Sequence, residues 1–257
     1  MPKLRLLSVF TLLVLALVNW SCDDEADTFV APITDLAVDF TAEFADRPLS
    51  ILAESYSYPT GAELRLVLFQ YYVSDLSLIS ANGDTVRLEE IDLIRYRDAG
   101  GSATISRQFA GVPTGDYTGV TFGLGVKPEL NNVDPNNFAA DFVLNENEFW
   151  SPRTRYVFAK IEANAQLPGS TTFDTGLTYH LGSNELYRRV ELNQRFTLRS
   201  SQDRLEIVAD VLRAMVGSDN EPYDISDPDQ RIVHGANQAV ARELWEGLAG
   251  QFSLNVR

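Results

Sequence analysis

Two histidines, His180 and His234, stand out among the 257 residues of this chain as groups that could do chemistry. A neutral imidazole is a good ligand for copper, zinc or nickel, and two imidazoles can chelate one ion when the fold brings them together. A histidine on a strand is also commonly a hydrogen-bonded surface or core residue. The interpretation as a metal site therefore depends on whether the two rings meet in space.

His180 lies in the stretch FDTGLTYHLG, residues Phe173–Gly182, in which apolar and polar residues alternate. In an extended segment Tyr179 and Leu181 fall on one side, and His180 and Gly182 on the other. The pattern predicts a strand with an apolar inner face and a polar face that carries one imidazole.

His234 directly precedes a predicted helix, Ala236–Leu248, in which Val240, Leu244 and Leu248 repeat every four residues. The positive end of a helix dipole disfavours an imidazolium at this position. A neutral ring would thus be available to a metal ion.

Two imidazoles are few for a metal site, because most protein sites for zinc or copper(II) have three or four donors. Water or a carboxylate would have to complete the shell. Asp174 and Asp210 lie near the candidates in the sequence, but no pattern assigns either. Met215 and Cys22 are the soft ligands after residue 21, which argues against a site for copper(I) built from sulfur.

Residues 1–21 have the organisation of a signal peptide. A basic start with Lys3 and Arg5 precedes the apolar run Leu6–Val18, which is too short to span a bilayer comfortably. Cys22, the one cysteine of the chain, follows directly. We interpret it as the lipidated first residue of a mature bacterial lipoprotein; the alternative is an incidental thiol near a cleavage site.

The acidic run Asp23-Asp24-Glu25 follows the cysteine and resembles the surface-export signal of Bacteroidota lipoproteins. It predicts a lipid-anchored protein of the outer membrane that faces the cell surface, with the periplasmic face as the alternative.

The formal net charge is −15, and loss of the two cations in residues 1–21 takes it to −17. A field of this sign repels phosphates, which excludes nucleic acid as a sensible partner. No cysteine follows Cys22, so the mature chain cannot form an internal disulfide and a hydrophobic core must hold the fold.

Short segments with apolar residues at alternate positions, separated by turn signals such as Asn82-Gly83-Asp84 and Pro113–Asp116, recur along the chain. They predict an all-β fold, an antiparallel β-sandwich with a short C-terminal helix. The predicted organisation is a signal peptide at 1–21, an acidic tether at 22–34 and one sandwich domain at 35–257. Besides the strand around His180, the predicted strands are Leu36–Glu43, Leu64–Leu68, Val73–Leu78, Thr85–Leu88, Ile91–Tyr96, Thr104–Phe109, Gly119–Val126, Tyr156–Ala163, Glu191–Leu198 and Leu205–Leu212.

Three glycines, Gly119, Gly123 and Gly125, share one face of the predicted strand Gly119–Val126. Without side chains they leave the backbone open to close approach by another element or by a ligand. We favour a crossing or bulge of the sheet over a ligand.

The order of motifs along the chain resembles the MbnP-like copper-binding family, whose members are secreted or lipid-anchored β-sandwich proteins. The motifs cover most of the chain after the signal peptide. They are FQYYVSDLSLI at Phe69–Ile79 followed by Asn82-Gly83, IRYRD at Ile94–Asp98, PTGDYTGVTFGLG at Pro113–Gly125 leading into Asn131, FWSPRTRYVFAKIE at Phe149–Glu162, LTYHLG at Leu177–Gly182, and His234 before a C-terminal helix.

The resemblance implies a copper ion bound by histidines, here His180 and His234. In the best-known members a tryptophan oxidised to kynurenine also takes part, and a dihaem peroxidase performs the oxidation. A dihaem cytochrome c peroxidase-like partner is therefore implied as well. Trp150 matches the first tryptophan of a Trp-x-Trp segment that continues into Gly-Tyr. Here Pro152 and Arg155 replace the second tryptophan and the glycine, and the methionine that commonly precedes the pair is missing, so copper binding survives the comparison better than the modification.

Two functional hypotheses follow. The first is a cell-envelope lipoprotein that binds copper for acquisition or buffering, without catalysis. The second is a surface lipoprotein that serves as a glycan-binding or protein-interaction sandwich with no metal site, with Tyr71, Tyr72, Trp150 and Tyr187 as aromatic platforms. The sequence contains no serine nucleophile elbow, phosphate-binding Walker loop, HExxH or CxxC motif, so we predict that the chain is not an enzyme.

Overall fold

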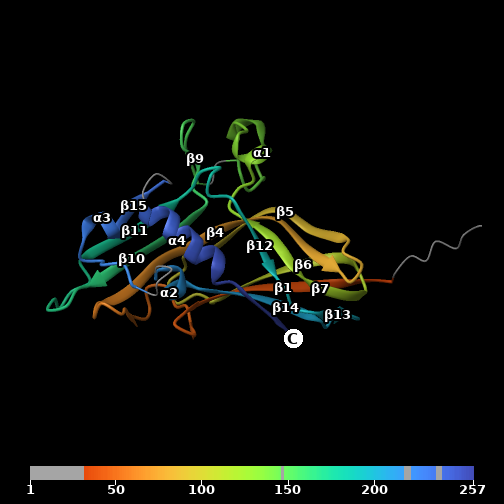
Figure 1. The fold of residues 1–257 in the computed structure, drawn as a ribbon, viewed down its shortest axis with the longest axis horizontal. Helices are drawn as coiled ribbons and strands as arrows, with labels where there is room; N and C mark the ends of the chain where they lie inside the picture. Colours follow the sequence, from red (N-terminus) through yellow and green to blue (C-terminus); the bar gives the residue numbers. More distant parts are fainter. Residues whose placement is uncertain (1–31, 146–147, 217–220, 236–238) are drawn as a thin grey trace, which may run out of the picture. The chain divides into compact units, whose positions relative to one another are not determined.

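The computed structural model describes residues 32–145, 148–216, 221–235 and 239–257 (Figure 1). The predicted signal peptide, Cys22 and most of the predicted tether lie outside the described residues. In chain order the elements are β1 (Ile33–Phe44), β2 (Arg47–Pro48), β3 (Tyr56–Ser57), β4 (Glu63–Ser80), β5 (Thr85–Tyr96), β6 (Thr104–Pro113), β7 (Gly115–Leu124), α1 (Pro128–Asn131), the 3-10 turn η1 (Pro135–Asn137), β8 (Phe149–Ser151), β9 (Arg155–Tyr156), β10 (Ala159–Gln166), β11 (Thr175–Leu181), β12 (Arg188–Leu192), β13 (Phe196–Leu198), β14 (Arg204–Asp210), α2 (Val211–Ala214), α3 (Pro228–Arg231), β15 (Ile232–His234), α4 (Ala239–Gly250) and β16 (Ser253–Val256).

The smaller of the two main sheets has the order β16-β14-β1-β2, with β6 also paired to β1. β1 is its central strand and runs parallel to β14 and antiparallel to β6. Alternate residues of β1, namely Leu36, Val38 and Phe40, are at most 1% exposed. Because side chains alternate between the two faces of a strand, these residues lie on one face of the sheet, and this face forms part of the hydrophobic core.

The larger sheet has the order β12-β7-β4-β10-β11-β15, with β3, β5 and β13 on its side branches. β4 is one strand of 18 residues rather than the two predicted segments. The strand contains one irregularity: Asp75 has a φ of +49° and the pairing with β7 shifts register between Ser74 and Ser77. Such a bulge bends a strand without ending it. β5 likewise runs unbroken through both predicted segments, Thr85–Leu88 and Ile91–Tyr96.

Buried apolar residues from both main sheets form one core cluster. The prediction of an all-β sandwich with a short C-terminal helix is thereby confirmed. Most strand pairs are antiparallel, but β1 with β14 and β11 with β15 are parallel. The second of these parallel pairs positions the candidate site.

The glycine-rich face of β7 meets neighbouring parts of the protein. A Cβ at Gly119 would strike the backbone of Leu192, and one at Gly123 would strike the ring of Tyr187. Gly125 has a φ of +95° and lies against the ring of Phe158. These contacts bear out a crossing of elements rather than a ligand as the reason for the glycines.

α4 packs along β11, β12 and β15 and against α2 (Figure 1). Its buried side chains include Leu244 and Leu248, as its four-residue repeat predicted. Trp245, fully buried, adds to this face. The predicted start of the helix at Ala236 falls outside the described residues, and the described helix ends at Gly250. Among the described residues, no helix has the length and apolarity needed to cross a membrane.

Candidate metal centre

The parallel pairing of β11 with β15 brings the two histidines together. His180 and His234 are direct partners across the two strands. Their ring centroids are 5.1 Å apart and their planes meet at 75°. The backbone just beyond the pair is tied down, because the Gly235 amide donates a hydrogen bond of 2.8 Å to the His180 carbonyl and Gly235 turns with a φ of +79°.

Trp150 lies beside both imidazoles. It comes from β8, which pairs with β9 in a small two-stranded sheet of its own. Its ring centroid is 5.9 Å from that of His180 and 5.3 Å from that of His234, in edge-on geometry in both cases. Its side chain is 51% exposed. The three site residues inferred from the sequence therefore form one cluster, although they are up to 84 positions apart in the chain, from 150 to 234.

A cavity of about 240 Å³ lies at this cluster. Gly182, directly after β11, is one of its lining residues, and a Cβ there would strike the backbone of residues 156–158, so only glycine allows this close approach. The lining residues are Trp150, Thr154, Tyr156, Val157, His180, Gly182, His234 and Gly235.

Glu162, which the sequence reasoning missed, holds one nitrogen of His180. Its Oε1 lies 2.7 Å from Nε2 of His180. A carboxylate accepts hydrogen bonds, so Nε2 donates and the lone pair of the neutral ring is on Nδ1. Burial lowers the pKa of His180 below its ordinary value, with Lys160 and His234 adding to this and Glu162 opposing it. The ring thus favours the neutral form that binds metals.

The histidines end a polar row that runs across the larger sheet. In register from strand to strand, Arg95 of β5 faces Gln70 of β4, which faces Lys160 of β10. Lys160 in turn faces His180, and His180 faces His234. We call these five residues the polar row. A second carboxylate, that of Glu148, forms ion pairs with both cations of the row.

The other candidates from the sequence are engaged elsewhere. Asp210 caps α2 and accepts from the amides of Ala45 and Asp46. Asp174 accepts from Thr172, and Met215 is fully buried in the core. In the part of the chain that the structure describes, no group of three or more His, Cys, Asp or Glu side chains is placed to hold a metal ion.

The separation of the two ring centroids is compatible with one shared ion. With nitrogen–metal distances of about 2 Å, two rings on one ion have centroids roughly 4.5–6.5 Å apart. The observed 5.1 Å falls in this range. Two protein nitrogens would leave the remaining positions to water or an exogenous ligand, in a cavity walled on one side by an indole ring.

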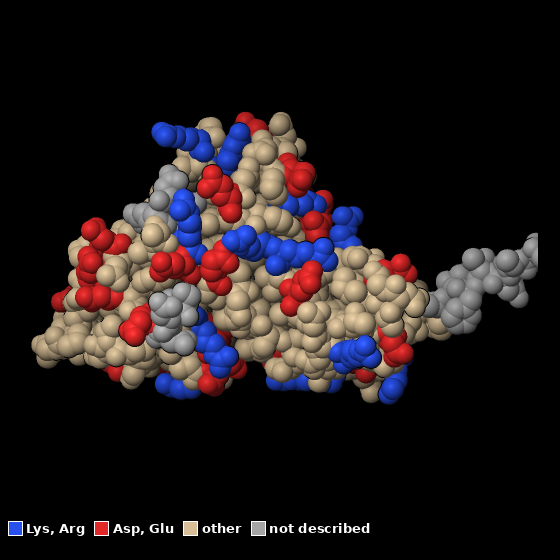
Figure 2. Space-filling model, viewed as in Figure 1, with Lys and Arg blue, Asp and Glu red and all other residues tan. Residues whose placement is uncertain are grey.

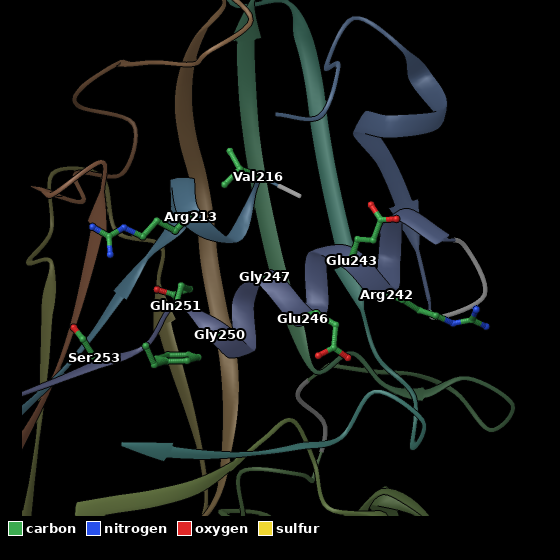
Figure 3. A pocket seen from close by; sticks show the side chains of 10 residues that line it. Arg213, Val216, Arg242, Glu243, Glu246, Gly247, Gly250, Gln251 and Ser253 are labelled. Carbon is green, nitrogen blue, oxygen red and sulfur yellow. The ribbon is translucent and has the colours of Figure 1, made fainter. Parts of the chain in front are cut away.

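A larger cavity, of about 620 Å³, lies between α2 and α4 (Figure 3). Arg213 of α2 and Arg242, Glu243 and Glu246 of α4 supply its charged side chains. It contains no histidine, and none of the residues inferred from the sequence to form the site lines it.

The fold and the cluster define a class of protein, a β-sandwich with two paired imidazoles at the end of its larger sheet. The model of the MbnP family matches residues 34–234, a span that takes in Trp150, His180 and His234. The chain belongs to this family.

A solved structure, MbnP from Methylosinus trichosporium, has the same fold with a TM-score of 0.51. The match covers 88% of this chain and 99% of that one, at 14% sequence identity. Comparison with the curated proteins gave no match.

Proposed function

We propose that this protein is a copper-binding protein of the cell envelope that acts in copper acquisition or buffering, without catalysis. His180 and His234 are the proposed ligands. The observation that carries the proposal is their placement as direct partners on adjacent strands, with ring centroids 5.1 Å apart. Membership in the MbnP family supports the same function.

Copper suits this donor set on chemical grounds. Imidazole nitrogen binds copper well, and among divalent first-row metals copper has the highest affinity for a given nitrogen site. Glu162 would orient His180 and raise the basicity of its free nitrogen, as outer carboxylates do in histidine metal sites. Trp150 would cover one side of the ion and limit access of water.

We further propose that Cys22 carries a lipid anchor in the outer membrane, with the domain facing the cell surface or the periplasm. Conversion of Trp150 to kynurenine by a dihaem peroxidase remains part of this proposal. The environment of Trp150 is compatible with it, since the side chain is 51% exposed and therefore accessible to a partner.

Titration of the purified metal-free protein with copper(II) tests the function. The emission of Trp150 should fall on binding, because the indole lies beside both proposed ligands. We expect a Kd below about 1 µM, and a loss of about 100-fold, or ~3 kcal/mol, in each of His180→Ala and His234→Ala.

Thr178→Ala is the matched control. Thr178 lies two residues before His180 on the same strand and pairs with Ile232, outside the proposed ligands. It should bind copper as the wild type does. Micromolar or weaker binding that neither histidine substitution changes would rule the site out.

The second hypothesis, a glycan-binding or protein-interaction sandwich, loses most of its proposed platform. Tyr71 and Tyr72 are fully buried in the core and cannot present a surface, so their assignment as aromatic platforms was wrong. Tyr187 is half-buried against Gly123. Trp150 is the remaining exposed ring of the four, and it is the one that contacts the histidines.

A further inference from the structure

The segment that carries Trp150 is fastened to the polar row by the residue two positions earlier. Glu148 contacts Arg95 and Lys160 of the row, and Trp150 contacts its two histidines. Residues 148–150 therefore lie along the polar row and contact it twice, through the carboxylate of Glu148 and the ring of Trp150. We call the Glu148 ion pairs the charged anchor.

The charged anchor is well built. Arg95 Nη2 lies 2.5 Å from Glu148 Oε1, and Lys160 pairs with the other oxygen. Arg95 is itself oriented by a 2.7 Å hydrogen bond from its Nε to Gln70. The carboxylate side chain is only 11% exposed, and those of Arg95 and Lys160 are 23% and 20% exposed. Ion pairs shielded in this way are more costly to break than surface pairs, because a lone buried charge would remain.

The electrostatics agree with this geometry. Burial alone would raise the pKa of Glu148, but Lys160, Gln70 and Arg95 together lower it below its ordinary value. The ionised carboxylate is therefore the form that the folded protein stabilises.

The backbone at Glu148 is also held in a conformation that it would not adopt alone. Its φ is +62°, in the left-handed region that costs a non-glycine residue about 1 kcal/mol or more. Its carbonyl accepts a 2.9 Å hydrogen bond from the amide of Val157. The ion pairs and this bond together stabilise the turn from which β8 starts.

We propose that Glu148 is a positioning residue that holds Trp150 over the paired imidazoles, through its ion pairs with Arg95 and Lys160. Without the charge, the β8–β9 segment shifts away from the sheet and the indole no longer covers the histidines. The effect on copper rests on the proposed function, whereas the effect on Trp150 does not.

Glu148→Gln tests the proposal, since it keeps the shape of the side chain and removes its charge. The metal-independent readout is acrylamide quenching of Trp150, taken as the difference between each protein and the same protein with Trp150→Phe. We expect the quenching constant to rise by up to about two-fold, because the indole would go from 51% to full exposure. Copper(II) affinity should fall about 10-fold, as for other outer residues of metal sites.

Two further variants keep the test decisive. Arg95→Gln removes the opposite partner and should reproduce both effects if Glu148→Gln fails to fold. Glu54→Gln breaks an exposed ion pair with Arg47, 2.7 Å long, and should change neither readout. Circular dichroism of each variant reports whether the sandwich is retained.

The outcomes separate the two claims. Increased quenching of Trp150 supports the positioning role even if the wild type binds no copper, a result that would remove the proposed function alone. Unchanged quenching in a folded Glu148→Gln protein overturns the positioning role. Unchanged quenching overturns the role even if copper affinity falls, because Glu148 would then affect the histidines by a route that does not involve Trp150.

Discussion

At the scale of single residues, Glu162 is the neighbour that sets the chemistry of His180. Its 2.7 Å contact with Nε2 directs the free lone pair to Nδ1. Sequence reasoning missed it because β10 pairs with β11 so that Lys160, not Glu162, stands opposite His180. A diagonal contact of this kind depends on strand partners and register, neither of which the sequence pattern shows.

We expect Glu162→Ala to lower copper(II) affinity about 10-fold, because His180 loses the group that fixes its tautomer and orientation. Glu162→Gln should lose less, since the amide oxygen can still accept the hydrogen bond. Isothermal titration calorimetry on the two variants measures both effects. Glu191→Gln, at an exposed pair with Arg189, is the control. Equal affinity in all three variants and the wild type would show that Glu162 has no part in binding.

At the scale of elements, the identity of most strands could be predicted from the alternation of apolar residues, as in β1, β10 and β11. Which strands pair with each other could not be predicted in this way. β15 has three residues and no distinctive pattern, and it follows β11 by 50 positions or more, so nothing local indicates that they pair. The meeting of His180 and His234 was therefore a hypothesis that only the sheet topology could decide.

At Gly182 the close approach of two backbone segments can be tested without changing either proposed metal ligand. We expect Gly182→Ala to lower the free energy of unfolding by about 2 kcal/mol, because the new methyl group meets rigid backbone. Urea unfolding measures the change.

Gly176→Ala, within β11 and six residues before Gly182, is the control. Nothing lies within 4 Å of a Cβ at Gly176, so its effect should stay within about 0.5 kcal/mol. Similar losses in both variants would contradict close approach as the reason for glycine at 182.

At the scale of the whole molecule, the chain carries an excess of negative charge. Acidic and basic side chains are interspersed on the face displayed in Figure 2, although the chain has 36 acidic and 21 basic residues. The negative excess argues for solubility and against phosphate-rich partners.

Attachment to the membrane is a prediction for the full chain. We expect the protein made with its leader to sediment with membranes, and Cys22→Ala to move it to the soluble envelope fraction, because the thiol is the proposed site of acylation. Cell fractionation followed by mass spectrometry of the N-terminal peptide measures both. A Cys22→Ala protein that still sediments with membranes would contradict a lipid anchor at this residue.

The pairing of β15 with β11 has one more consequence. It extends over three residue pairs, and within it Val233 is fully buried while His234 is exposed. A slip of β15 by a single position would turn Val233 out to solvent and drive His234 into the core. The apolar cost of exposing one valine therefore keeps the two imidazoles aligned, so a side chain outside the proposed site helps to set its geometry.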